Sequence, residues 1–151
     1  MSMLTEKQEE LIESFGVIQE EMGLPPASAR VNALLIIADN VELTFDDIRE
    51  SLDLSKSATS NAIKTLLMMQ QIGYKTKPGD RKRYFYSKLG EWQNNFRDKI
   101  KALTPYKEIL NEILDNRTTE TREFNIKLKG FAEFIEYYQE EGVKLINNWK
   151  K

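Results

Sequence analysis

The sequence predicts a mainly α-helical fold with one small β-hairpin, and three observations support this. Apolar residues recur at the 3.6-residue period of a helix over most of the 151 residues. Between residues 74 and 86 the pattern changes to a period of two around a Pro-Gly pair. Near the C-terminus a long apolar stripe follows. The length suits one domain, or one small domain with appended helices.

Two helices are expected first. Thr5 and Gln8 have the spacing of a capping box, and Gly23 with Pro25 ends the helix that follows. The second helix starts near Pro26 and runs to residue 38; it is apolar on most sides, which predicts that it is buried. The apolar stripe expected on the first helix is Leu4, Leu11, Phe15, Ile18 and Met22.

The next two helices are short and closely connected. Thr44 is expected to cap a helix over residues 45–52, whose first turn holds Asp46 and Asp47, where the helix dipole favours anions. Ser55 is expected to cap the next helix, from Lys56 to about residue 71. Only residues 53–55 separate the two, which is typical of a helix-turn-helix.

A β-hairpin is expected after the helix-turn-helix. Residues 74–77 and 83–86 are rich in aromatic and β-favouring side chains. Pro78 and Gly79 suit the central positions of a type II turn between them. The tip of this hairpin, or wing, is strongly basic.

The remaining sequence is expected to be helical. A helix starting near Trp92 is expected to bend at Thr104-Pro105, although a kink in one continuous helix is the alternative. After a linker over residues 116–119, the longest helix covers about residues 119–148. Its apolar residues follow a 3.5-residue period, which predicts packing against a long partner helix. The partner is a second subunit or, alternatively, the chain's own helix over residues 92–114. The stripe is Phe124, Leu128, Phe131, Ile135, Tyr138, Gly142, Leu145 and Trp149.

These elements predict three regions: an N-terminal dimerisation helix over residues 1–24, a winged helix-turn-helix domain over residues 25–90, and a C-terminal helical dimerisation region over residues 91–151. The fold class is therefore mainly α with a small β-hairpin wing, in which dimerisation helices lie on both sides of the winged helix-turn-helix domain.

The distribution of charge indicates DNA as the partner. The net charge is −2, yet the segment from Ser55 to Lys88 holds eight cations and a single anion, Asp80, and so carries +7. The rest of the chain carries −9. Such a basic module attracts a phosphate backbone, whereas the acidic remainder repels it.

Eleven residues are predicted to bind DNA. Polar and basic side chains of the second short helix have types that suit a major groove: Asn pairs with adenine, Ser and Thr bond any base or phosphate, and Lys neutralises phosphate. The arginines of the wing suit a narrow minor groove. Solvated, merely solubilising surfaces are the alternative for both. The helix residues are Lys56, Ser57, Thr59, Ser60, Asn61 and Lys64, and the wing residues are Lys75, Lys77, Arg81, Lys82 and Arg83.

The composition argues against catalysis. With no His and no Cys, thiolate or imidazole metal ligands and Ser-His or Cys-His nucleophiles are excluded; we predict no enzyme activity, no metal and no cofactor. An enzyme that uses carboxylates is the alternative, but the acidic cluster around Asp39, Glu42, Asp46 and Asp47 is better explained as a helix start. No secretory signal or membrane-spanning apolar run is present, so a cytoplasmic location is expected.

Two motifs resemble the MarR superfamily of winged helix-turn-helix transcriptional regulators: the helix sequence Ser-Lys-Ser-Ala-Thr-Ser-Asn-Ala-Ile-Lys-Thr-Leu and the wing sequence Gly-Asp-Arg-Lys-Arg-Tyr-Phe-Tyr. The wing tip and the helix starting near Trp92 resemble its GbsR branch. The resemblance implies that Asp80 orients a basic residue toward the minor groove. The superfamily has Arg where Lys82 stands, so Arg81 and Arg83 are also candidates for that role.

The resemblance also implies dimers formed by the N- and C-terminal helices, and a small-molecule effector for which the sequence shows no motif. The aromatic residues of the helical regions could form a cage for a quaternary ammonium group, although a core or dimer role is the simpler interpretation. The residues expected at the dimer interface are Leu11, Phe15, Phe124, Leu128, Phe131, Ile135, Tyr138 and Leu145.

The resulting hypothesis is a sequence-specific DNA-binding regulator, in the first instance a repressor. A homodimer would place two recognition helices about 34 Å apart on a pseudo-palindromic operator. The alternative is a winged-helix module that binds proteins and no DNA.

Overall fold

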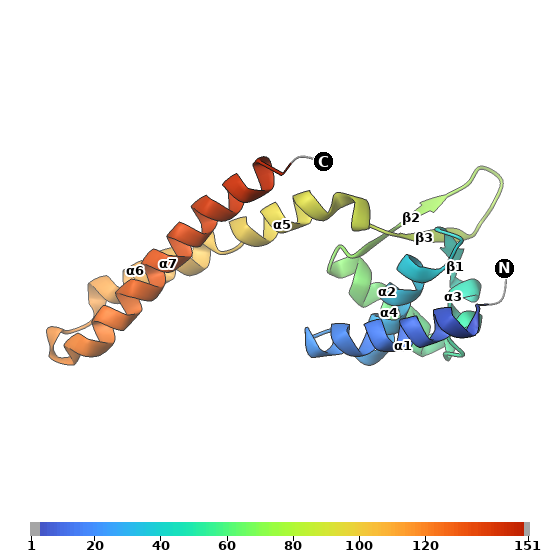
Figure 1. The fold of residues 1–151 in the computed structure, drawn as a ribbon, viewed down its shortest axis with the longest axis horizontal. Helices are drawn as coiled ribbons and strands as arrows, with labels where there is room; N and C mark the ends of the chain where they lie inside the picture. Colours follow the sequence, from blue (N-terminus) through green and yellow to red (C-terminus); the bar gives the residue numbers. More distant parts are fainter. Residues whose placement is uncertain (1–3, 150–151) are drawn as a thin grey trace. The chain divides into compact units, whose positions relative to one another are not determined.

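The computed structural model describes residues 4–149 (Figure 1). The chain forms two compact units, residues 1–90 and residues 91–151. Each unit is described by itself.

The first unit begins with α1 (Glu6–Glu21) and α2 (Pro26–Ile37), which pack against each other. The predicted capping box is confirmed, because the Thr5 hydroxyl accepts from the Gln8 N–H at 3.1 Å and the Gln8 side chain accepts from the Thr5 N–H at 2.9 Å. The predicted burial of the second helix is also confirmed, since most residues of α2 are buried.

The apolar stripe predicted for α1 is only partly correct: Leu4 and Phe15 are partly buried and pack against the core. Leu11, Ile18 and Met22 are exposed, whereas Ile12, Gly16 and Gln19 face α2. Specific polar contacts decide the orientation. The Gln19 side chain donates to the Ala29 carbonyl at 3.2 Å and accepts from Asn32. Gly16 leaves room for Arg30, whose Nε would lie 3.0 Å from a Cβ at that position. These contacts place the side of α1 with Ile12, Gly16 and Gln19 against α2, so Leu11, Ile18 and Met22 remain outside.

The helix-turn-helix consists of α3 (Phe45–Ser51) and α4 (Lys56–Met68). Thr44 and Asp47 form a capping box on α3, with hydrogen bonds of 3.2 and 3.0 Å. Ser55 caps α4 by accepting from the Ala58 N–H at 3.1 Å. The helix α4 ends three residues before the predicted residue 71, because Gln70 adopts a left-handed φ of 56° and Gln71 turns back to bond the Leu66 carbonyl.

The predicted hairpin is formed by β2 (Ile72–Thr76) and β3 (Arg83–Ser87). Gly79 has a φ of 77°, and the Asp80 N–H donates to the Lys77 carbonyl at 3.0 Å, as a type II turn requires. A third strand, β1 (Leu43–Thr44), pairs with β3 and gives the order β1-β3-β2. The sequence did not predict β1, since two residues are too few to show a period.

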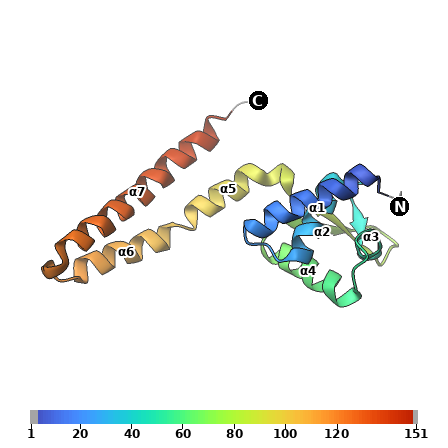
Figure 2. The ribbon, with the colours of Figure 1, turned by 60° about the horizontal axis from the view of Figure 1, so that its bottom comes forward.

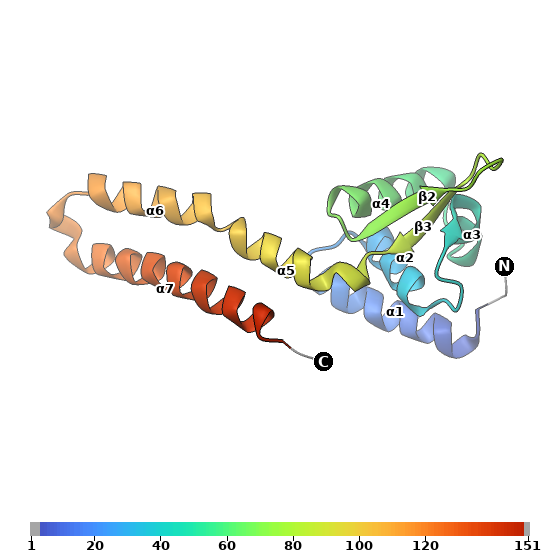
Figure 3. The ribbon, with the colours of Figure 1, turned by 90° about the horizontal axis from the view of Figure 1, so that it is seen from above.

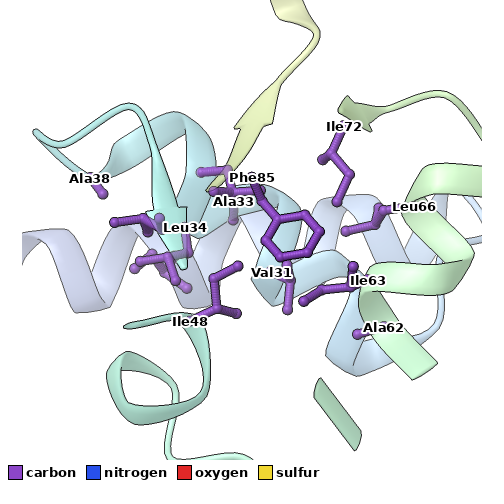
Figure 4. Packing of buried hydrophobic residues seen from close by; sticks show 13 residues of the cluster. Val31, Ala33, Leu34, Ala38, Ile48, Ala62, Ile63, Leu66, Ile72 and Phe85 are labelled. Atoms are coloured by element: carbon purple, nitrogen blue, oxygen red, sulfur yellow. The ribbon is translucent and has the colours of Figure 1, made fainter. Parts of the chain in front are cut away.

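The core of the first unit joins the helices to one face of the sheet (Figure 4). Val31 and Leu34 of α2 and Leu66 of α4 are fully buried, and they meet Ile72 and Phe85 of the sheet. Each such side chain stabilises the fold by about 1.5–3 kcal/mol relative to an exposed position. The core therefore fixes α4 and the hairpin on a common support, with α4 running beside the sheet (Figure 3).

The second unit is a helical hairpin. α5 (Trp92–Lys101) and α6 (Thr104–Asn116) are separate helices, which confirms the predicted bend at Thr104-Pro105. α7 (Arg122–Asn147) returns along both of them (Figure 2). Its start lies three residues beyond the predicted residue 119, because residues 119–121 form a 3₁₀ turn.

The predicted stripe of the last helix requires a correction. Ile135 is buried and Leu128 is half-buried, and both pack with Leu110 and Ala132 inside the hairpin. These two residues therefore contact the chain's own α6, as the alternative interpretation expects. Phe124, Phe131, Tyr138 and Leu145 remain exposed.

Candidate nucleic-acid interface

One side of α4 presents an uninterrupted polar and basic surface. We call it the α4 face and define it by five exposed residues, Lys56, Ser57, Ser60, Asn61 and Lys64. The opposite side of the helix is held in the core by Ala62, Ile63 and Leu66. Burial of the apolar side therefore turns the α4 face outward, as the sequence predicted for these five residues.

Thr59, the sixth residue predicted on this helix, is not part of the α4 face. Its exposed fraction is 0%, and its hydroxyl donates to the Ser55 carbonyl at 2.8 Å. Thr59 lies three, four and seven positions before Ala62, Ile63 and Leu66, so it belongs to the buried stripe. The prediction that Thr59 binds DNA is therefore wrong, and helical spacing contained the signal that places it inside.

The N-terminus of α4 is suited to a negative partner. Ser55 and Ser57 hydroxyls lie 3.3 Å apart at this end, and the first turn contains no acidic residue. A helix N-terminus carries a partial positive charge that favours anions such as phosphate. Here that charge is not neutralised by a neighbouring carboxylate of the first turn.

The tip of the wing is organised by Asp80. Its carboxylate accepts from the Lys82 N–H at 2.9 Å and from the Tyr84 hydroxyl at 2.5 Å. The Tyr84 hydroxyl, and then the Lys82 N–H, hold the pKa of the Asp80 carboxyl below its usual value. Asp80 therefore contacts the backbone of Lys82 and fixes the loop, while the side chains of Arg81 and Lys82 stay exposed at the tip.

Arg83 lies on the same face of the hairpin as the buried Phe85, two residues further along β3. Its guanidinium sits 4.8 Å from the centre of the Tyr74 ring, and Tyr74 in turn packs 6.1 Å from Phe85. Tyr74 is 46% exposed. It is a residue that the sequence did not single out, although its alternation with Ile72 on β2 places it on that side.

Lys75 of β2 and Lys77, directly after β2, project from the opposite side of the hairpin. The Lys75 Nζ lies 2.5 Å from Glu42 Oε1, and the Lys77 Nζ lies 3.6 Å from Glu42 Oε2. Lys77 also sits 3.9 Å from the centre of the Tyr84 ring. The structure therefore separates these two lysines from the other predicted DNA contacts and gives both the same carboxylate. Glu42 is distant in sequence, and no local pattern pointed to it as their partner.

The other predicted cations have no carboxylate partner within residues 4–149. This holds for the two lysines of the α4 face and for the three basic residues at the wing tip, Arg81, Lys82 and Arg83. Their charges remain available to an external anion. In the same part of the chain there is no helix long and apolar enough to cross a membrane, and no group of three potential metal ligands.

The architecture has a counterpart among solved structures. A solved structure described as a transcriptional regulator matches with a TM-score of 0.78 and 17% identity, covering 93% of this chain and 96% of that one. A complex of Staphylococcus aureus MepR with DNA gives a TM-score of 0.44, with 14% identity and coverage of 87% and 91%. The adhesin competence repressor of Streptococcus pyogenes gives 0.40, with 19% identity and coverage of 91% and 99%.

At 17% identity, the first of these matches shows a common fold and not a common function. No protein-family model and no curated protein sequence matches the chain. Together with the sheet and helix order, the comparison identifies the fold as a winged helix-turn-helix with additional helices, the fold class that the sequence predicted.

Proposed function

We propose that this protein is a sequence-specific DNA-binding transcriptional regulator of the MarR type. The observation that supports this most strongly is the coexistence, on one core, of the exposed α4 face and a basic wing tip whose cations have no carboxylate partner in the described part of the chain. In this proposal α4 enters the major groove and the wing tip follows the adjacent minor groove.

The α4 face supplies both base and backbone contacts. Asn61 is positioned in the middle of the face, where its amide would pair bidentately with adenine, and Ser57 and Ser60 would accept or donate to neighbouring bases. Lys56 and Lys64 would neutralise phosphates on either side of the groove. Arg81 is the residue of the tip with the preferred chemistry for a minor groove, since its guanidinium is exposed.

Substitutions within the interface test this assignment. Asn61→Ala should reduce the preference for the selected sequence over a shuffled duplex, by about 1–3 kcal/mol. Arg81→Ala combined with Lys82→Ala should weaken binding to both duplexes and flatten the dependence on salt. Lys127→Ala on α7 is the control, since it removes a positive charge outside the interface. It should leave the sequence preference and the salt dependence unchanged. Equal affinity of wild type for every duplex would contradict sequence-specific reading.

We also propose that the protein is a homodimer formed by its helical regions. Aromatic residues of α6 and α7 form one apolar face on the hairpin: the rings of Tyr106 and Phe131 lie 6.2 Å apart, and those of Phe134 and Tyr138 lie 6.4 Å apart. All four are 47–58% exposed. Contiguous exposed apolar surface of this kind marks interaction sites, and a two-fold dimer would match the symmetry of a pseudo-palindromic operator.

Sedimentation measurements test the dimer. Phe131→Asp should convert the dimer to a monomer and weaken binding to a two-half-site duplex. Ile126→Asp introduces the same charge on another side of α7, where the side chain is 61% exposed, and should leave the dimer intact. Dissociation by both variants, or by neither, would contradict the proposed interface.

The finer assignments rest on the same proposal. A repressor that blocks polymerase, a place near the GbsR branch and a small-molecule effector come from the sequence resemblance, and a cytoplasmic location is an expectation from the sequence itself. The first unit has an open cavity of about 570 Å³ lined mainly by Leu35, Ile36, Val41, Tyr86 and Leu89, which is large enough for a small molecule. Thermal shifts in a panel of small amphipathic compounds would test the effector.

The alternative function is a docking domain that binds proteins and never DNA. It predicts that wild type binds no DNA at any salt concentration, so that removing the cations of the α4 face has no effect in a DNA-binding assay. Gel shifts of random duplexes at salt concentrations between about 50 and 300 mM, where phosphate contacts respond to salt, would separate the two functions. A docking domain would shift no duplex.

A further inference from the structure

Glu42 precedes β1 and is placed between two lysines of the wing. Its side chain is 25% exposed, whereas those of Lys75 and Lys77 are 53% and 49% exposed. The hydrogen bond from Lys75 and the nearby charge of Lys77 hold the pKa of the Glu42 carboxyl below its usual value. The carboxylate is therefore ionised near neutral pH, and one anion serves two cations.

The two lysines are held on one side of the hairpin by local geometry. They are two residues apart, Lys75 in β2 and Lys77 directly after its end, and both side chains reach Glu42. Lys75 stands opposite Tyr84 in the strand register, and the ring of Tyr84 lies 3.9 Å from the Lys77 ammonium group. Lys77 thus has a carboxylate and a ring face as preformed partners, and its position is the last before the basic tip.

We propose that Glu42 is an intramolecular competitor of phosphate, which retains Lys75 and Lys77 and thereby limits the affinity of the protein for DNA. This inference rests on the proposed DNA-binding function and adds a residue that determines affinity. Exposed ion pairs are weak and are screened by salt, so the two lysines can exchange the carboxylate for phosphate. The exchange loses the existing contacts with Glu42, and this loss reduces the gain in DNA affinity. Without Glu42, both ammonium groups would be free beside the tip.

A purely mechanical role for Glu42 makes the opposite prediction. If the ion pairs served as a strut that orients the wing, their removal would weaken DNA binding and leave fewer productive contacts. The sign of the change in affinity therefore separates competition from support.

The first experiment compares Glu42→Gln with wild type as full-length protein. Fluorescence anisotropy with the best duplex selected from a random pool is recorded between about 50 and 300 mM salt, where phosphate contacts dominate the slope. We expect Glu42→Gln to bind about tenfold tighter at the lowest salt, with a slope of log K against log salt steeper by about 0.9 for each lysine released to a phosphate.

Asp39→Asn is the matched control. Asp39 lies in the same loop, is exposed, and has no ion pair within residues 4–149. Its substitution removes the same charge without releasing the two lysines, so the slope should stay at the wild-type value. An equal increase for both variants would overturn the competitor role and indicate a general field effect.

The second experiment removes the lysines. Lys75→Gln combined with Lys77→Gln should have little effect on DNA affinity in the wild-type background and should abolish the gain in the Glu42→Gln background. An equal loss in both backgrounds, or weaker binding by Glu42→Gln while its melting temperature is unchanged, would overturn the inference. If wild type binds no duplex at all, the proposed function fails together with it; if wild type binds and Glu42→Gln is no tighter, this inference fails alone.

Discussion

Thr59 and Ser60 are neighbours in α4, yet the structure gives them opposite roles, and this difference can be measured. Thr59 is completely buried and donates its hydroxyl to the Ser55 carbonyl at 2.8 Å. Ser60 is exposed on the α4 face. We predict that Thr59→Ala changes the stability of the fold and not its DNA contacts, whereas Ser60→Ala does the reverse.

The magnitude for Thr59→Ala follows from what is removed. The substitution deletes one buried methyl group, with about 0.8 kcal/mol for its burial, and one hydrogen bond with a net contribution of about 1 kcal/mol. The Ser55 carbonyl keeps the N–H of residue 59 as a partner at 3.0 Å, so no unpaired acceptor adds to the loss. A small cavity adds to it, and the free energy of unfolding should fall by about 2 kcal/mol in total.

Urea unfolding at equal protein concentration, followed by circular dichroism, gives the stability of each variant. Fluorescence anisotropy with the selected duplex gives the DNA affinity, at a temperature where both variants are folded. Ser60→Ala should keep the unfolding midpoint of wild type and lose affinity. The reasoning would be refuted if Thr59→Ala kept wild-type stability and lost DNA affinity, because Thr59 would then contact DNA directly.

Three further predictions concern the wing and the core. Gly79→Ala should destabilise the protein by about 1 kcal/mol, since Gly79 has a φ of 77°, while Gly90→Ala, where an added Cβ meets nothing within 4 Å, should be neutral in the same urea titration. Tyr84→Phe should raise the pKa of Asp80 toward its usual value in an NMR titration, and an unchanged pKa would show that Tyr84 is not the cause. Because the pKa of Asp80 is lowered in the fold, its contribution to stability is present at neutral pH and is lost as the pH falls below the usual aspartate value of about 4. Leu34→Ala, at a position with 0% exposure, should reduce the free energy of unfolding by about 2–5 kcal/mol, and a smaller loss in the urea titration would contradict the packing of Figure 4.

Features that depend on neighbours in sequence could be predicted. The capping box of Thr5, the cap at Thr44 and the Pro-Gly turn of the wing require only residues within a few positions, and the structure contains all of them. The five residues of the α4 face were also correctly placed outside, because burial of Ile63 and Leu66 fixes the opposite side. Local rules were sufficient wherever the determining contacts are local.

Features that depend on distant contacts were missed. The orientation of α1 is determined by the hydrogen bonds of Gln19 with α2, and the apolar stripe of α1 does not contain that information. In the sequence, Lys75 and Lys77 are basic residues like Arg81. In the fold they form ion pairs with Glu42, which lies more than thirty positions earlier. A charge count from sequence therefore overstates the number of cations that are free for DNA.

The most direct test of the account is a hydroxyl-radical footprint of the full-length protein on the duplex with the highest affinity from a random pool. The account predicts two equivalent protected half-sites with centres about 10 base pairs, or one turn of the double helix, apart, and weaker protection of the sugars in both half-sites for Asn61→Ala at the same protein concentration. A uniform footprint without half-sites that Asn61→Ala leaves unchanged would contradict reading of DNA by α4.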